Sequence, residues 1–361
     1  MLRAALIGLP SSGKTTLFQL MTSIHDTPRG KGDVNIGISK VPDERLDTLT
    51  AMYNPRKRVP ATVEFTDIVA ARGGAQALVD VAGYKNADAL VHVVRAFRDP
   101  AVAHPAGSIG PARDAQTMED ELILADLGVA ERRLERIEKD LKKGKSAELE
   151  KERDLVQRCK EALEHATPLR ALQLAGEDLK RLRGFQFLSA KPLLLVMNLD
   201  EREVADVGAD VGRAAEKTGL APFLAHASTR AIALCTKIEL EIAQLGAEDA
   251  KAFLADLGLN ESGLDRVIRT SYDLLGYISF FTVGEDECRA WSIARGTPAQ
   301  LAAGEIHSDI ERGFIRAEVV AYDALIGRGS MAACREHGEV RLEGKDYVVQ
   351  DGDIINFRFA T

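Results

Sequence analysis

Residues 8–15 of the chain, GLPSSGKT, combine residue types that suit phosphate chemistry. Gly8 and Gly13 let the backbone fold closely around a phosphate with its N–H groups pointing inward. Lys14 adds a cation between the β- and γ-phosphates, where it can also stabilise charge during catalysis, and Thr15 offers a hydroxyl to Mg²⁺. The segment predicts a P-loop for a magnesium-bound nucleoside triphosphate. The other loop residues expected at the phosphates are Pro10, Ser11, Ser12 and Thr16.

The residues around this loop predict the elements that must hold it in place. Residues 2–7 form an apolar run of strand length, and residues 15–21 have a helical pattern. Strand, glycine loop and helix in this order are the context of a phosphate-binding loop, because a helix N-terminus attracts anions. A chance glycine-rich turn is the alternative interpretation.

A candidate metal-shell residue, Asp67, lies near the end of the apolar run at residues 63–69. From a strand tip its carboxylate could support Mg²⁺ together with Thr15. The alternative is a carboxylate that only caps the strand end. GTPase-like switches read DxxG at this point, whereas this chain has Ala70 in place of that glycine, and no glutamine follows to orient water.

A candidate base-recognition element follows the apolar run at residues 192–197 and reads Asn198-Leu199-Asp200-Glu201. Guanine-specific switches have N-K-x-D there, in which the aspartate accepts the guanine N1 and N2 protons. Here leucine replaces the lysine and glutamate replaces the last aspartate, so the element does not predict guanine selection. The alternative role for Asn198 is a helix cap.

The apolar runs predict a doubly wound, mostly parallel α/β sheet. Strand-like runs occupy residues 63–69, 89–94 and 192–197, residues 222–226 are a candidate last strand, and helical patterns lie between them. We assign residues 1–116 and 185–277 to this nucleotide-binding domain.

Residues 117–184 predict an inserted helical hairpin. The stretch is rich in Glu, Lys and Arg, and leucines recur at seven-residue spacing at positions 127, 134 and 141. Residues 144–146 break the run, after which Leu149, Val156 and Leu163 resume the spacing. This pattern is typical of two antiparallel coiled-coil helices. The nearly balanced charges favour a solvated surface over a nucleic-acid-binding stripe.

A third domain is expected over residues 278–361. ISFFTV, CRAWSI, AEVVAY and DYVVQ are short β-like runs separated by glycine-containing turns, and DGDIINFRF alternates like a closing strand. These runs predict a small α+β domain with Trp291 as a core residue. Arg312, Arg316 and Arg341 could belong to a packing motif or present a basic surface to RNA phosphate, and His307 is expected to be structural.

The bulk composition restricts the class of protein. The chain has 361 residues and a formal net charge of −8, which argues against general coating of nucleic acid. Its four cysteines lie far apart and form no CxxC pair, which indicates reduced thiols and neither a disulfide framework nor a zinc site. Neither a membrane-spanning run nor a signal peptide is apparent, so we expect a cytoplasmic protein with no membrane or DNA partner.

Longer segments resemble the YchF subfamily of Obg-like ATPases. In the first part of the chain these are GLPSSGKTT, VPDERLD, NLDE and CTKIELEIAQL. FLADLGLNESGLDRVIRTSYDLLG leads into GEDECRAWSI, AAGEIHSDIERGFIRAEVVAYD and RLEGKDYVVQDGDIINFRF, which resemble the ubiquitin-like TGS domain of that family. The resemblance extends over nearly the whole chain, in the family's domain order.

The resemblance implies an ATPase that associates with the ribosome or its RNA. Asn198 and Glu201 would then face the base with Leu199 stacked nearby, and the backbone around Cys235 and Thr236 would close over it. The family pattern RAF…D…H is met by residues 95–97 and His104. His104 would act in place of the usual catalytic glutamine, and the alternative is an exposed loop histidine.

The chain departs from the family pattern at both switch regions. The first is shortened to HDTPRGKGDVNIG, where Thr27 is the remaining weak metal-ligand candidate, and the second reads AARGGAQALVD. Three functions follow as hypotheses. The first is a slow, Mg²⁺-dependent ATPase that prefers ATP to GTP and has a regulatory role in translation or stress. The others are a catalytically weak, nucleotide-occupied module that binds ribosomes or RNA, and a GTP-specific translational GTPase.

Overall fold

The computed structural model describes residues 2–24, 34–68, 81–144, 146–174, 176–208, 210–226 and 228–360. The chain divides into two compact units. The larger unit comprises Leu2–Ile38 and Glu64–Leu274, and the smaller one comprises Ser39–Val63 and Leu275–Thr361 together with Met1. This division differs from the expected domain boundaries, because β3 (Lys57–Val59) pairs in parallel with β9 (Glu287–Ala294) and so draws residues 39–63 to the C-terminal region.

The larger unit is built on a six-stranded sheet with the order β2-β4-β1-β5-β6-β7. The β1–β4, β1–β5, β5–β6 and β6–β7 pairs are parallel, as expected for the α/β class. Every residue of β5 and β6 is buried, which requires cover on both faces of the sheet. The strands are β1 (Arg3–Ile7), β2 (Val34–Lys40), β4 (Thr62–Ile68), β5 (Ala89–Arg95), β6 (Leu193–Asn198) and β7 (Thr229–Leu234).

The expected last strand at residues 222–226 is wrong. This segment forms a 3₁₀ turn, Ala221–Ala225, with Pro222 near its start. Proline has no N–H to donate to a sheet and suits the first turn of a helix. The last strand is instead β7, whose Thr229 pairs with Leu193 of β6. Strand β2 was also not expected.

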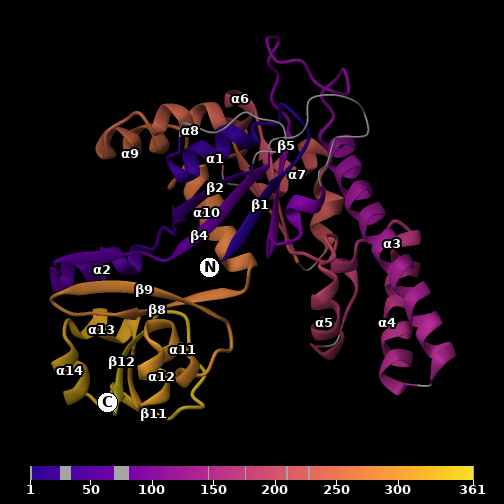
Figure 1. Ribbon diagram of the computed structural model, residues 1–361. Coiled ribbons are helices and arrows are strands. Elements are labelled where there is room, and N and C mark those ends of the chain that lie inside the picture. The colour runs from indigo at the N-terminus through magenta and orange to yellow at the C-terminus, as the bar shows by residue number, and fades with distance from the viewer. Residues whose placement is uncertain are drawn as a thin grey trace. The chain divides into compact units, whose positions relative to one another are not determined.

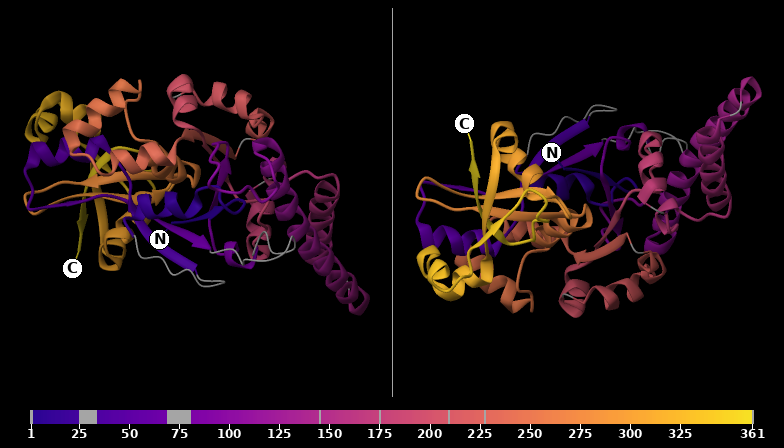
Figure 2. Two further views of the ribbon diagram at one scale, coloured as in Figure 1. Left: turned by 90° about the horizontal axis from the view of Figure 1, so that it is seen from above. Right: turned by 90° about the horizontal axis from the view of Figure 1, so that it is seen from below.

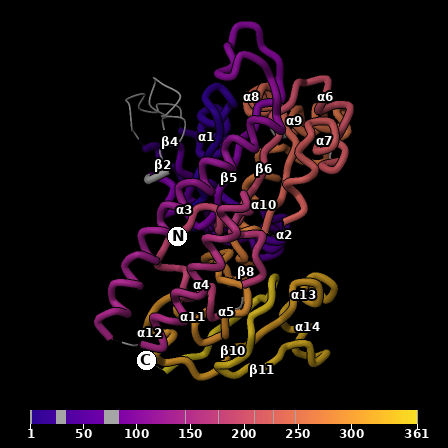
Figure 3. The backbone as a smooth tube through the Cα atoms, turned by 90° about the vertical axis from the view of Figure 1, so that its right-hand side faces the viewer, coloured from indigo at the N-terminus to yellow at the C-terminus, as the bar shows by residue number. Residues whose placement is uncertain are grey.

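The helical hairpin consists of α3 (Pro111–Lys143) and α4 (Ala147–Glu164), which lie side by side in Figures 1 and 3. In both views of Figure 2 this magenta pair projects away from the sheet of its unit. Leu134, Val156 and Leu163 are buried in one cluster, as the seven-residue spacing predicts. Arg133 donates two hydrogen bonds of 2.7 Å to the carboxylate of Glu152 across the hairpin. Helix α3 begins at Pro111, before the expected boundary at residue 117.

Shorter helices complete the larger unit. Helix α10 contacts α1, β6 and β7, and α7 contacts β6 and β7. The helices are α1 (Lys14–Thr22), α5 (Gly176–Leu182), α6 (Glu201–Val207), α7 (Val211–Thr218), α8 (Thr236–Ile242), α9 (Ala247–Asp256) and α10 (Gly263–Leu274). Further 3₁₀ turns are Val81–Tyr84, Leu169–Ala171 and Arg183–Phe185.

The smaller unit has a six-stranded mixed sheet with the order β11-β10-β12-β8-β9-β3. Trp291 lies against its core, stacks with Phe280 at 6.4 Å and donates its Nε1–H to the Thr282 hydroxyl. The expected strand DYVVQ is limited to a bridge between Val348 and Pro298. The remaining strands are β8 (Tyr277–Thr282), β10 (Phe314–Ala321), β11 (Arg341–Glu343) and β12 (Asp353–Phe359). The helices are α2 (Glu44–Tyr53), α11 (Ala299–Ile306), α12 (Ser308–Arg312), α13 (Tyr322–Arg328) and α14 (Met331–Glu336).

Candidate functional site

The loop between β1 and α1 has a backbone that its glycines make possible. Gly8 has φ of 140° and Gly13 has φ of 99°, values that residues with a side chain rarely adopt. A Cβ atom on Gly8 would lie 2.4 Å from the carbonyl oxygen of Val93 in β5. Ser11, at φ of 63°, takes the left-handed conformation despite its side chain. The loop therefore follows a tight path that a side chain at either glycine would disturb.

Helix α1 starts directly from this loop and leaves its first N–H groups open to an anion. Its N-cap is Gly13, which offers no side-chain cap, and its first turn contains no acidic residue. Uncapped N–H groups and the helix dipole favour a negatively charged group at this end. The first turn contains Lys14, Thr15 and Thr16, so the structure brings the predicted phosphate ligands to one helix end.

Lys14 is buried inside the loop, where its Nζ donates hydrogen bonds to the carbonyl oxygens of Gly8 at 2.9 Å and Leu9 at 2.8 Å. Burial lowers the pKa of Lys14 to about 8, and the nearby Asp67 carboxylate opposes this shift. The buried cation is costly in the free protein. An anionic ligand would favour its charged form, so this ammonium is suited to bind a polyphosphate.

Asp67 and Thr15 form the candidate metal-binding pair. The Thr15 hydroxyl donates to Asp67 Oδ2 at 2.9 Å, because β4 lies beside β1 with Asp67 opposite Leu6. The other carboxylate oxygen, Oδ1, is buried and has no hydrogen-bond partner among the described residues. A hydroxyl beside a buried carboxylate is an oxygen donor set that suits Mg²⁺. Among the described residues no cluster of three or more His, Cys, Asp or Glu side chains could hold a metal, so Mg²⁺ here would need further oxygen ligands from phosphate and water.

Asn198 forms a hydrogen-bonded bridge within the protein, and its contact with a base stays a prediction. Its Nδ2 donates to the carbonyl oxygen of Ser12 at 3.0 Å, and its Oδ1 accepts from the Thr236 N–H at 3.1 Å and from the Thr236 hydroxyl at 3.2 Å. Both polar atoms are thus engaged within the protein, and the buried side chain ties the phosphate loop to the β7–α8 loop. It is not the N-cap of α6, which is Asp200, but its Oδ1 accepts the first N–H of α8, so the expected capping alternative holds at that helix.

The other predicted base-recognition residues lie around this bridge. Leu199 is buried in the core, where its side chain also borders a cavity of about 400 Å³. Glu201 is exposed and forms an ion pair with Lys237, which raises the pKa of Lys237. Cys235 is buried and is the N-cap of α8, which begins at Thr236. Contact of these residues with a base remains a prediction.

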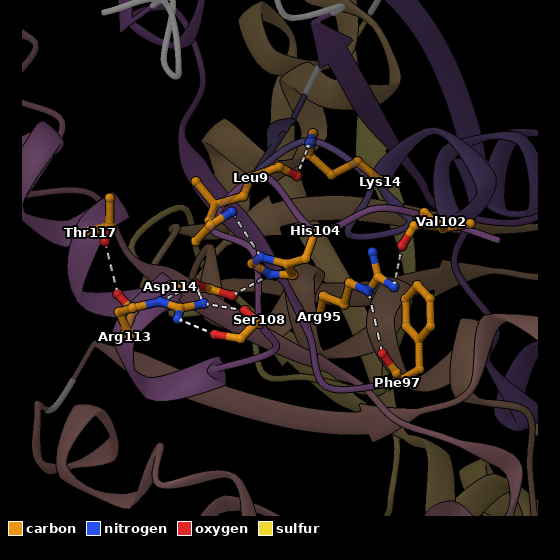
Figure 4. A network of polar contacts seen from close by, with 11 residues as sticks. Leu9, Lys14, Arg95, Phe97, Val102, His104, Ser108, Arg113, Asp114 and Thr117 are labelled. Atoms are coloured by element: carbon orange, nitrogen blue, oxygen red, sulfur yellow. Dashed lines mark hydrogen bonds and ion pairs between the residues drawn. The ribbon is translucent and has the colours of Figure 1, made fainter. Parts of the chain in front are cut away.

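His104 is not the exposed loop histidine that the sequence left as an alternative, since its side chain is only 5% exposed. Its Nε2 lies 2.8 Å from Asp114 Oδ2, and its Nδ1 accepts from the Ala106 N–H at 3.1 Å. Figure 4 shows the ring pointing toward Asp114 while Arg113 binds the same carboxylate. Asp114 and Arg113 were not predicted from the sequence, because nothing in their spacing from His104 marks them as partners.

Arg95 organises the loop that carries His104. Its guanidinium donates to the carbonyl oxygens of Phe97 at 3.3 Å and Val102 at 2.9 Å, and it stacks over the Phe97 ring at 4.5 Å (Figure 4). Its Nη1 is buried and has no hydrogen-bond partner in the part of the chain that the structure describes. Thr27, Ala70 and the second switch at residues 71–80 lie outside the described residues.

The phosphate loop, the parallel sheet and the Asp67 strand together define a P-loop nucleoside triphosphatase. Comparisons with known proteins place the chain more narrowly. It is 43% identical to "Ribosome-binding ATPase YchF" of Bacillus subtilis (strain 168) over 367 residues, covering 99% of both chains. It is 36% identical to the protein of the same name from Escherichia coli O157:H7, again covering 99% of both chains.

A solved structure and a family model agree with these relatives. The "Structure of the Schizosaccharomyces pombe YchF GTPase" matches with a TM-score of 0.85 and 28% identity, covering 99% of this chain and 97% of that one. The family model YchF-GTPase_C, described as "Protein of unknown function (DUF933)", matches residues 277–360. The chain belongs to the YchF family. None of the helices within the described residues is long and apolar enough to span a bilayer.

Proposed function

We propose that the chain is a Mg²⁺-dependent nucleoside triphosphatase that prefers ATP to GTP, hydrolyses the γ-phosphate slowly and acts on the ribosome in the cytoplasm, with a regulatory role in translation or stress. The observation that carries the nucleotide part is the preformed cradle in which Gly8, Gly13 and the buried Lys14 surround the start of α1. The relatives named as ribosome-binding ATPases support the choice of ATP and of the ribosome.

The residues of the cradle have separate tasks in this proposal. The N–H groups of the loop and of the first turn of α1 bind the phosphates, and the Lys14 ammonium stabilises charge on the β- and γ-phosphate oxygens. Thr15 would hold Mg²⁺ directly and Asp67 would hold it through its water shell. The metal, when bound, would neutralise charge on the same phosphate oxygens. Positioning and electrostatic stabilisation then carry catalysis, with little covalent work for the protein.

Two features support slow turnover. Ala70 stands where GTPase switches have a glycine, and no glutamine follows it. His104, the proposed replacement for that glutamine, uses both ring nitrogens within the protein. Water positioning therefore requires a change in the His104 loop before each hydrolysis event.

Titration of labelled ATP and GTP against the wild type and Glu201→Asp, combined with phosphate release, tests the nucleotide proposal. We expect tighter binding of ATP than of GTP by the wild type, and a smaller ratio for Glu201→Asp if this side chain reads the base. Glu216→Asp is the matched control, because Glu216 is an exposed helical glutamate of α7 outside the base-recognition segment. Tighter GTP binding by the wild type, or no ATP-dependent phosphate release with or without ribosomes, would contradict the proposal.

The ribosome part of the proposal has a candidate surface on the smaller unit. Arg316 of β10 lies directly opposite Arg358 of β12 in the antiparallel pair. Like charges at opposite positions destabilise a sheet, so this pairing is costly unless an anion binds there. Glu318 partly balances the pair by binding Arg358, and Arg335 lies 3.9 Å from the same carboxylate. The cationic excess suits RNA phosphates.

Of the arginines considered from the sequence, Arg316 fits this surface better than the other two. Arg312 binds Asp309, and Arg341 lies near both Glu343 and Asp353. We therefore expect that Arg316→Ala combined with Arg358→Ala weakens cosedimentation with ribosomes and reduces its salt dependence. Arg312→Ala is the control, and an equal loss in that variant would contradict this surface.

A catalytically weak, nucleotide-occupied binding module is the second candidate function. It is favoured by the same engagement of both His104 nitrogens, which leaves no free group of this side chain for water. Rates of phosphate release for Lys14→Ala, Ala70→Gly and His104→Ala separate the two. The enzyme requires Lys14 and His104 and gains little from Ala70→Gly, whereas the weak module gives negligible rates throughout.

A further inference from the structure

His104 is held from both sides by groups of fixed position. With the Ala106 N–H donating to Nδ1, the ring proton lies on Nε2 and is donated to Asp114 Oδ2 at 2.8 Å. A ring in this state can neither accept a proton from water nor donate one to phosphate. In Figure 4 the ring faces the Asp114 carboxylate, and the side chain is almost fully buried.

We propose that Asp114 is a positioning residue that withholds His104 from the attacking water, and that release of this hydrogen bond limits nucleotide hydrolysis. The inference deepens the proposed function and rests on the role of His104 in it. It adds a residue of α3 to the control of the reaction.

The hydrogen bonds show which partner is fixed. Asp114 Oδ1 accepts from Arg113 Nε at 3.0 Å and from Arg113 Nη2 at 2.8 Å, so the carboxylate is oriented and its charge balanced without His104. Arg113 in turn donates to the Ser108 carbonyl at 2.6 Å and to its hydroxyl at 3.0 Å. Loss of the His104 contact leaves this arrangement intact, so His104 is the partner that can leave.

The backbone anchors of the loop limit the segment that has to move. Arg95 holds the carbonyl of Val102 on one side of His104, and Arg113 holds Ser108 on the other. The segment between these anchors contains His104 and Gly107, whose φ of 75° and open surroundings permit local backbone change. A short movement confined to residues 103–107 is therefore enough to free the ring.

Asp114 also connects the histidine to the helical insertion. It lies in the first turn of α3, which continues without a break to Lys143 and packs against α4. A partner that shifts this helix would shift the acceptor of the His104 hydrogen bond. The structure thus offers a physical route by which a macromolecule bound at the hairpin could alter the rate of hydrolysis.

The test measures steady-state phosphate release from ATP by the full chain for four variants and the wild type. These are Asp114→Ala, His104→Ala, the double variant and Asp120→Ala. Asp120 lies on the same helix, is exposed, and pairs with Gln116, so it is the matched control. We expect Asp114→Ala to raise kcat about twofold to tenfold, the change in population that one intramolecular hydrogen bond controls. KM should stay constant, the double variant should match His104→Ala, and Asp120→Ala should match the wild type.

The outcomes separate this inference from the proposed function. If His104→Ala is inactive and Asp114→Ala has an unchanged or lower kcat, the withholding role is overturned while the proposed ATPase stands. If the wild type releases no phosphate, or His104→Ala is as active as the wild type, the role of His104 fails and the inference with it. A rise in kcat that persists in the double variant also overturns it.

A measurement on the wild type covers the case in which Asp114→Ala does not fold. Imidazole ¹⁵N spectra, assigned by comparison with His104→Ala, should show the neutral form protonated at Nε2 in the free protein. Addition of Mg²⁺ and a non-hydrolysable ATP analogue should change these signals as the ring leaves Asp114. Signals that stay constant with the analogue bound would overturn the inference.

Discussion

The two ends of the candidate site differ in how their polar groups are used. At the phosphate end, Lys14 is buried beside an uncapped helix N-terminus, and one buried oxygen of Asp67 has no partner within the described ranges. At the other end, the side chains of Asn198 and His104 form hydrogen bonds with other groups of the protein. The first end has open donors and a free acceptor, whereas both ring nitrogens of His104 are already in use, so under our proposal that ring has to be released before it can act.

This contrast teaches that binding and catalysis depend on different properties of the fold. At the phosphate end, a buried cation and left-handed backbone are present in the protein without a ligand. Both are unfavourable by themselves but place groups where phosphates would bind, which is preorganisation. The His104 end is internally hydrogen-bonded, which stabilises the free protein, and under our proposal these bonds delay its part in hydrolysis. The chain should therefore bind nucleotide well and turn it over slowly, and the following experiments test each part of that contrast.

The largest expected effect belongs to Lys14→Met. Phosphate release should fall about 10²- to 10³-fold, the usual cost of removing one donor to developing charge. The nucleotide-free protein should melt at the same temperature as the wild type or a higher one. Burial of the Lys14 ammonium is unfavourable, as its lowered pKa indicates, and methionine has no charge to desolvate. Calorimetry of the free variant and a phosphate-release assay measure the two quantities. A clear fall in the melting temperature would mean that Lys14 stabilises the fold and is not held there for a ligand.

The second effect is a pH dependence of nucleotide binding. Because the pKa of Lys14 is lowered to about 8 in the free protein and phosphates favour its charged form, affinity should fall about tenfold per pH unit above pH 8. Binding at pH 9 should take up close to one proton, which calorimetry in two buffers of different ionisation enthalpy measures. An affinity that stays constant between pH 8 and pH 10 would contradict the buried-cation description.

The same pKa shift has a consequence for stability. The folded pKa of Lys14 lies below its ordinary value of 10.5, so the unfolded chain binds more protons between about pH 8 and pH 10.5. Lys14 therefore contributes a stability that rises with pH through this window. Lys14→Met should lack this rise, which gives the calorimetric experiment an internal control.

The phosphate end could be predicted from the sequence because its residues are neighbours in the chain. Gly8, Gly13 and Lys14 belong to one local motif, and Asp67 follows from the end of a buried strand. The partners of His104 could not be predicted, since Asp114 and Arg113 come together with it only through the packing of α3 and its loop.

The same reasoning applies to the base end and to the sheet. Asn198 forms hydrogen bonds with Ser12 and Thr236, which are distant in sequence, so no local sequence pattern predicts them. The strand predicted at residues 222–226 was wrong. Its apolar composition suits a strand, but Pro222 has no N–H to donate to a neighbouring strand. Local motifs thus predicted the ligand cradle, while the long-range hydrogen bonds that restrain the catalytic end needed the structure.

A further prediction concerns Gly13, which belongs to the phosphate loop and lies next to the Asn198 amide. Gly13→Ala should lower the free energy of unfolding by about 1–3 kcal/mol for its strained backbone, and should also displace the Asn198 amide, which lies 2.5 Å from the new Cβ position. Gly329→Ala is the matched control, because Gly329 also has positive φ, at 76°, in the left-handed region, but no atom within 4 Å of its Cβ position. The control should lose only about 1 kcal/mol. Urea unfolding without nucleotide measures both, and equal losses would show that the Asn198 contact is unimportant.

The smallest expected effect concerns the candidate base-recognition segment, where Asn198 is buried and the Glu201–Lys237 ion pair is exposed. Glu201 and Lys237 form an ion pair whose side chains are 49% and 70% exposed, so Lys237→Ala should shift the melting temperature by less than about 2 °C. Asn198→Ala, which leaves the Thr236 N–H and the Ser12 carbonyl without their partner, should lower the free energy of unfolding by about 1–3 kcal/mol. Thermal melting of both variants without nucleotide makes the comparison. If Lys237→Ala destabilises the chain as much as Asn198→Ala does, then the exposed ion pair stabilises the fold as strongly as the buried bridge, which would contradict this ranking.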